Sequence, residues 1–131
     1  MIENKVIKGK FTVMADYGFA WGWTTEYFKD GTECCQACSA SRYTTEIDNN
    51  GGEVAKLDAD FVEEICQWQN GFEGTLYNPV FDWEAFNKQG EKLTEKLKQQ
   101  IGHLFDEVVY EVPWEYEEYL RTGLMPFDYI R

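Results

Sequence analysis

The chain has 131 residues, with 24 acidic side chains against 12 basic ones and a formal net charge of −12. This length predicts a single domain over residues 1–131, and the 44% hydrophobic content is enough to build a core. The negative charge argues against direct binding to nucleic acid or to an anionic membrane, because both would repel the chain. It favours either simple solubility or a partner that is itself basic.

The N-terminus has no apolar run of signal-peptide length, and no stretch approaches the roughly 18 apolar residues of a membrane span. We therefore expect a cytoplasmic protein. In that reducing compartment the four cysteines, at positions 34, 35, 38 and 66, are expected to be thiols rather than disulfides.

The segment "KVIKGKFTVMADY" mixes β-branched and aromatic residues with polar ones, which predicts a first strand with a turn at Gly18. Trp21 and Trp23 follow, separated by one glycine. In an extended chain these two indoles face the same way, and we expect both to pack over the end of the helix that carries Trp68.

Residues 29–56 are rich in Gly, Ser, Thr, Asn and Asp, which predicts a loop in which "SRYTTEI" is the one candidate for a short strand. A helix is expected next, with Asp58 as its N-cap and Gly71 as its stop. Its apolar face has helical spacing and consists of Leu57, Phe61, Ile65 and Trp68.

A second helix is expected between Asp82, as N-cap, and Gly102, at a C-cap position. Its apolar stripe consists of Phe86, Leu93, Leu97 and Ile101. Gly90 falls within that stripe. Glycine lowers helix propensity, so we expect it to mark a close contact with a neighbouring element.

The segment "EVVYEV", residues 107–112, predicts a further strand that ends at Pro113, and the tail beyond it begins with a short helix. Two amphipathic helices need an apolar surface to cover, and a small sheet supplies it. The fold class we predict is α+β, a two-layer single domain in which two amphipathic helices cover a small sheet. The last strand is expected to pair near the first.

The sequence contains no convincing catalytic or cofactor-binding motif. Cys35 and Cys38 have C-x-x-C spacing, but zinc needs two further ligands, and Cys34, Cys66 and the single histidine, His103, are the obvious candidates. No Lys, Arg or His lies within three residues of the motif to lower a thiol pKa. We expect structural thiols and no bound metal, with a small metal or redox protein as an alternative.

Acidic residues alternate with aromatic ones near the C-terminus. Six acids and no Lys or Arg lie between His103 and Leu120. Rings supply contact area and carboxylates steer a basic partner, so this pattern favours a protein-binding surface. A strand with one buried face, followed by a solvated helix, explains the same pattern about as well. The candidate partner-binding residues are Asp16, Tyr17, Glu26, Tyr27, Glu111, Trp114, Glu115, Tyr116, Glu117, Glu118 and Tyr119.

The motif Ala15-Asp16-Tyr17-Gly18, with Trp21 and Trp23 after it and "DWEAFNKQG" at residues 82–90, resembles a group of small acidic bacterial proteins that carry an N-terminal "ADYG". The match covers most of residues 11–112. It departs at "FAWGW", where that group often has "WPLW", and in the cysteine-bearing loop. The resemblance implies an immunity protein that neutralises a bacterial toxin, and it brings no catalytic motif.

The sequence therefore predicts a non-enzymatic inhibitor that covers the basic active site of a toxin, such as a nuclease. An anti-restriction or anti-CRISPR protein that mimics nucleic acid is the main alternative. Against it, Lys88, Lys92 and Lys96 interrupt the acidic surface.

Overall fold

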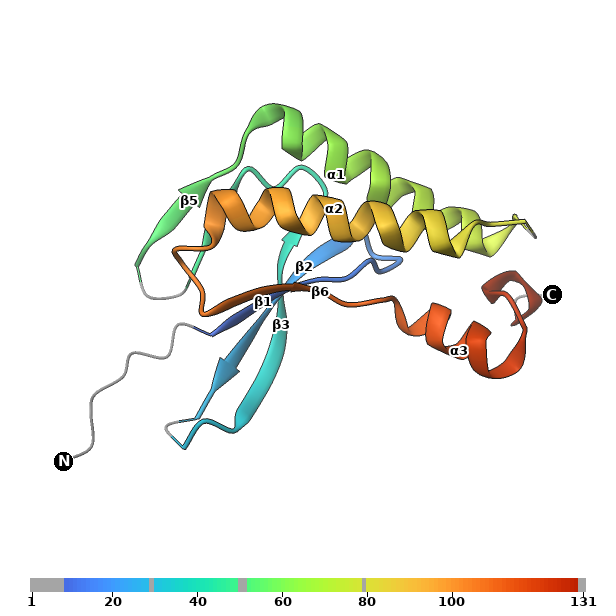
Figure 1. Ribbon diagram of the computed structural model, residues 1–131, viewed down its shortest axis with the longest axis horizontal. Helices are drawn as coiled ribbons and strands as arrows, with labels where there is room; N and C mark the ends of the chain where they lie inside the picture. Colours follow the sequence, from blue (N-terminus) through green and yellow to red (C-terminus); the bar gives the residue numbers. More distant parts are fainter. Residues whose placement is uncertain (1–8, 29, 50–51, 79, 130–131) are drawn as a thin grey trace.

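The computed structural model describes residues 9–28, 30–49, 52–78 and 80–129, so the part of the first predicted strand that contains Val6 lies outside the described residues (Figure 1). The strands are β1 (Lys10–Val13), β2 (Ala20–Tyr27), β3 (Glu33–Ser41), β4 (Glu46–Asp48), β5 (Val54–Lys56) and β6 (Glu107–Tyr110). The α-helices are α1 (Ala59–Gly71), α2 (Trp83–Ile101) and α3 (Trp114–Thr122), with 3-10 turns at Phe72–Leu76 and Pro126–Tyr129. Among the described residues, no helix has the combined length and apolar character that a membrane span requires.

The predicted two-layer α+β architecture is confirmed. Four strands form a mixed sheet in the order β3-β2-β1-β6, while β4 and β5 form a separate hairpin. Helices α1 and α2 lie together on one side of the sheet, and the β2–β3 hairpin extends away from them (Figure 1). The predicted apolar faces of both helices are buried in the core between the layers.

Both predicted helix starts are confirmed. Asp82 is the N-cap of α2, where its Oδ1 accepts a hydrogen bond of 3.0 Å from the Ala85 N–H. Asp58 is the N-cap of α1, although its side chain makes no capping hydrogen bond. Instead its backbone N–H donates to Oε1 of Gln100 on α2, at 2.9 Å, which links the start of one helix to the end of the other.

The central strand β1 pairs on both sides, antiparallel to β2 and parallel to β6. The prediction that the last strand lies beside the first is therefore confirmed. Parallel neighbours need a long crossover between them, and the helical layer supplies it. The strand β6 ends at Tyr110, two residues earlier than expected.

The prediction of a loop over residues 29–56 is wrong, because most of that segment forms β3, β4 and β5. The strand β3 reads "ECCQACSAS", with few β-branched residues and no large ring. It is a strand because it pairs along most of its length with β2, and tertiary pairing of this kind overrides local propensity. The predicted short strand "SRYTTEI" overlaps only the end of β3 and the start of β4.

The prediction that Trp21 and Trp23 face the same way is also wrong. The register between β2 and β3 shifts on both sides of Gly22, and an extra residue in a strand reverses the alternation of its side chains. Trp21 is fully buried beneath α1, with its ring 6.5 Å from that of Phe61. Trp23 is paired with Thr12 and lies on the opposite face of β2. Trp21 therefore packs over one end of the helix that carries Trp68, as predicted, whereas Trp23 does not. Trp68 itself stacks on Phe86 at 4.7 Å.

The close contact expected at Gly90 is confirmed. A Cβ at this position would lie 2.6 Å from Cζ of Tyr110 and 2.9 Å from Cζ2 of Trp68, and nearer still to Cε1 of Tyr110. The Tyr110 hydroxyl donates a 2.6 Å hydrogen bond to Oδ1 of Asn87, one turn earlier in α2. The missing side chain at Gly90 therefore lets β6 pack directly against α2.

We expect Gly90→Ala to lower the free energy of unfolding by about 1–3 kcal/mol, because overpacking at this contact outweighs the gain of up to ~1 kcal/mol in helix propensity. Chemical denaturation checks this. Gly71→Ala is the matched control, because Gly71 also lies in a helix and a Cβ added there would meet no atom within 4 Å. That variant should be neutral or slightly stabilising. Equal effects of the two substitutions would contradict the close contact.

Candidate partner-binding site

A small cavity lies where the end of β1 meets the start of α3. Its volume is about 160 Å³. Its lining comes from the segment that follows β1, from β2 and β3, and from the first residues of α3. The lining residues are Met14, Ala15, Asp16, Trp23, Gln36, Trp114 and Glu115. Three of the candidate residues, Asp16, Trp114 and Glu115, are thus brought together, although Asp16 is far from the other two in the sequence.

Backbone hydrogen bonds fix the segment that leaves β1. The Met14 N–H donates to the Trp21 carbonyl and the Asp16 N–H to the Ala20 carbonyl, each at 3.1 Å. Oδ1 of Asp16 accepts from the Tyr17 N–H at 2.8 Å, and its backbone carbonyl accepts from Nε2 of Gln69 on α1. The position of the Asp16 carboxylate is therefore set by the turn itself.

The start of α3 is held beside that turn by the sheet. The Glu111 N–H donates to the Val13 carbonyl at 2.9 Å, which continues the β1–β6 pairing past the end of the strand. Pro113 is buried and is the N-cap of α3, and its carbonyl accepts from the Tyr116 N–H. The two residues between Pro113 and Tyr116, which are Trp114 and Glu115, consequently face the end of β1.

Burial and like charge act together on Glu115. Burial raises the pKa of the Glu115 carboxyl above its ordinary value, its own backbone N–H opposes the rise, and the charge of Asp16 adds to it. Burial also raises the pKa of Tyr17 to about 12, against a hydrogen bond to Thr75, and the charges of Glu115 and Asp16 contribute. Two carboxylates thus share one partly desolvated corner of the surface.

Tyr17 is packed more deeply than expected for a contact residue. Its ring stacks on that of Phe72 at 4.5 Å, and its hydroxyl is 2.5 Å from Oγ1 of Thr75. These contacts attach the turn after β1 to the 3-10 turn that follows α1. The main role of Tyr17 in the structure is therefore to hold Asp16 in place.

The three rings of α3 divide into two groups. Tyr116 and Tyr119 are half-buried, with ring centroids 5.3 and 6.2 Å from that of Trp83 on α2. Trp114 points away from this contact and is 66% exposed. The two tyrosines anchor the helix, which leaves Trp114 as the ring that is open to a partner.

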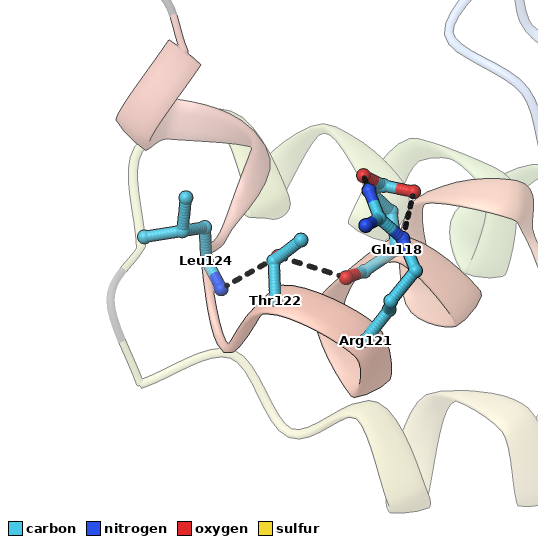
Figure 2. A network of polar contacts seen from close by, with 4 residues as sticks. All are labelled: Glu118, Arg121, Thr122 and Leu124. Carbon is cyan, nitrogen blue, oxygen red and sulfur yellow. Dashed lines mark hydrogen bonds and ion pairs between the residues drawn. The ribbon is translucent and has the colours of Figure 1, made fainter.

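Glu118 already has partners within its own helix (Figure 2). Arg121 forms an ion pair with the Glu118 carboxylate, and the Thr122 hydroxyl donates to the Glu118 carbonyl at 2.8 Å. The Leu124 N–H in turn donates to the Thr122 hydroxyl at 3.1 Å, which closes the end of α3. The charge of Glu118 is thus partly offset before any partner arrives.

The remaining candidate residues do not line the cavity. Glu111 and Glu117 are exposed near it. Glu26 and Tyr27 lie further along β2, three and four residues beyond the lining residue Trp23, which is roughly 10–13 Å of strand. The structure therefore divides the predicted contact residues between a surface around α3 and a separate hairpin end.

The two described thiols do not lie in a common site. Cys38 is exposed on the edge strand β3, whereas Cys66 is buried on α1, where its Sγ accepts from the Tyr43 N–H. Within the described residues, no group of three or more His, Cys, Asp or Glu side chains is arranged to hold a metal ion. The side chains of Cys34 and Cys35 lie outside the described part of the chain.

Sequence reasoning misses four of the seven cavity residues: Met14 and Ala15, which it assigns only to the first strand segment, and Trp23 and Gln36. Simple alternation places Trp23 in the core, because a bulge cannot be recognised from the pattern, and Gln36 falls in the predicted loop. The one available signal is Gly22 between the two tryptophans. A Cβ there would lie 2.7 Å from Cβ of Ala40, so only glycine fits at this irregular point of the strand.

Comparison with known proteins does not assign the chain to a family. No protein-family model matches the chain, and searches of curated proteins and of solved structures found no match.

The raised pKa of Glu115 gives a test of the site's electrostatics. Folding favours the protonated carboxyl, so its contribution to stability is greatest at low pH and is lost as the pH rises through the folded-state pKa. We expect Glu115→Gln to have a higher melting temperature than the unaltered protein at pH 7. The difference should disappear near pH 3, where the carboxyl is protonated in both states.

Thermal denaturation followed by circular dichroism measures this difference. Glu117→Gln is the control, because it removes an exposed charge from the same first turn of α3 and so accounts for the helix dipole. A Glu115→Gln protein that is less stable than the unaltered one at pH 7 would show that the carboxylate has a favourable partner and that our description of the site is wrong.

Proposed function

We propose that this chain is a non-enzymatic inhibitor that binds a basic protein, and that the partner is a bacterial toxin, such as a nuclease, neutralised in the cytoplasm. One observation carries the proposal. Asp16, Trp114 and Glu115 come from opposite ends of the sequence and gather around one cavity on the surface. A constellation of rings and carboxylates of this kind matches the anchors found at protein interfaces.

Exposed apolar side chains on α3 support a docking role. No residue of this helix is fully buried. Trp114 and Leu120 are 66% and 64% exposed, and Leu124 just beyond the helix is also exposed. Large apolar side chains that are exposed on a helix, next to acidic ones, are common at protein-binding surfaces.

The charge distribution supports a basic partner. The net charge is −12, and the stretch between His103 and Leu120 contains acids but no Lys or Arg. Such a field accelerates the approach of a basic protein and weakens as salt is added. The resemblance of residues 11–112 to small acidic "ADYG" proteins of the immunity type points to the same class of partner.

The two alternatives receive less support. Lys88, Lys92 and Lys98 line a groove between α2 and β6, so the surface is not uniformly phosphate-like, as a mimic of nucleic acid requires. A shared site for Cys38 and Cys66 does not fit their positions on the exposed edge of the sheet and in the core.

The proposal predicts that co-expression of this chain with its cognate toxin restores the growth of cells that the toxin otherwise arrests. Asp16→Lys combined with Glu115→Lys should weaken toxin binding by at least about 30-fold, equivalent to the ~2 kcal/mol of an interface hot spot. Titration calorimetry on the purified pair measures the loss, and a growth assay shows whether protection is lost with it.

Glu53→Lys combined with Glu63→Lys is the matched control. It makes the same change in net charge at two exposed positions that do not line the cavity. This variant should retain protection and lose affinity only through the weaker long-range field. Failure of the unaltered protein to bind or neutralise any toxin would refute the proposed function. Equal losses of toxin affinity in the two double variants would refute the proposed location of the binding site.

A further inference from the structure

The cavity beside α3 is the right size for one side chain. Its volume of about 160 Å³ equals that of roughly five water molecules in the liquid, at about 30 Å³ each. Pockets for drug-sized ligands are larger, about 300–1,000 Å³. A small, partly enclosed space on a protein-binding surface is therefore better matched to a single residue of a partner than to a free metabolite.

The cavity offers aromatic faces to that residue. Trp23 and Trp114 both line it, and the indole N–H of Trp23 donates to the Met14 carbonyl at 3.0 Å, which fixes the ring. Because that N–H is occupied, Trp23 offers the cavity an aromatic ring and no hydrogen-bond donor. Indole faces attract cations, and they do so more strongly in a partly desolvated site.

Among the described residues, the lining of this cavity contains two carboxylates and no basic side chain. Asp16 and Glu115 supply acceptors, and the amide oxygen of Gln36 is a further acceptor beside them. The two carboxylates are close enough for the charge of Asp16 to act on Glu115. A cation placed between them would relieve this repulsion.

A metal ion does not fit this set of residues. Two carboxylates and an amide provide few of the six or more oxygen ligands that Ca²⁺ takes, and the indoles provide none. An arginine side chain can interact with both the aromatic rings and the carboxylates that line the cavity. Its planar guanidinium stacks on aromatic faces, pairs with carboxylates through two parallel hydrogen bonds, and is less strongly hydrated than the ammonium group of lysine.

We propose that the cavity formed by Asp16, Trp23, Gln36, Trp114 and Glu115 receives an arginine side chain of the bound partner. The inference rests on the proposed function for the source of the arginine, since a basic toxin surface would supply it. The binding of a guanidinium group to the cavity is a property of this chain alone, so it can be tested without the toxin.

The test is a nuclear magnetic resonance titration of the ¹⁵N-labelled protein with Nα-acetyl-arginine amide, its neutral citrulline analogue and its lysine analogue. The indole N–H signals of Trp23 and Trp114 should shift saturably with arginine, while those of the buried Trp21 and Trp68 stay unchanged. The lysine analogue should bind at least about threefold more weakly, and the citrulline analogue should give no saturable shift.

Asp16→Asn combined with Glu115→Gln should weaken arginine binding by about tenfold, because both charge-assisted contacts are lost. Glu111→Gln combined with Glu117→Gln removes two nearby charges outside the cavity. This control should change the affinity for arginine by less than about twofold. Trp114→Ala provides a second variant, which should also weaken arginine binding, and because the ring is exposed its loss should not affect folding.

Equal binding of the arginine and citrulline analogues, tighter binding of lysine, or equal losses in the two double variants would overturn the proposal. The outcome is separate from that of the toxin experiment. Arginine binding without toxin neutralisation would support the arginine pocket and reject the proposed function. Neutralisation that is unaffected by Asp16→Asn and Glu115→Gln would support the proposed function and reject the pocket.

Discussion

The candidate site depends on the parallel pairing of β6 with β1. Parallel neighbours run in the same direction, so the chain leaves both strands at the same end of the sheet. The turn after β1 and the start of α3 therefore emerge side by side, and the hydrogen bond from Glu111 to Val13 extends the pairing to that point. Gly90 stabilises the arrangement from the other layer, because it lets Tyr110 of β6 pack against α2.

The same arrangement separates the structural aromatic residues from the exposed ones. Tyr17, Tyr116 and Tyr119 pack against rings of the core and fix the turn and the helix on either side of the cavity. Trp23 is oriented by its hydrogen bond to Met14, and Trp114 is left exposed. Glu115 is held in a position where burial and the charge of Asp16 disfavour its ionised form. A preorganised but electrostatically unfavourable carboxylate is common where a protein awaits a ligand.

Much of the fold could be predicted from local signals. The N-caps at Asp58 and Asp82, the 3.6-residue periodicity and the valine-rich segment before Pro113 identified both helices and β6. The strand β3 could not be recognised, because its small residues become a strand only through pairing with β2. The site was predicted only in part, for the same reason. Acidic and aromatic residues marked both ends of the chain, but their meeting depends on the β1–β6 register, and the bulge beside Gly22 decides where Trp23 lies.

The most direct test of the central claim is amide hydrogen exchange on the protein, alone and in complex with the toxin that we propose it neutralises. Our account predicts that complex formation slows exchange in residues 14–16, around Gln36 and in the first turn of α3, because these segments surround the cavity. Exchange at residues 26–28 and 30–33, toward the far end of the β2–β3 hairpin, should not change. Protection confined to that hairpin, or to the groove between α2 and β6, would contradict it.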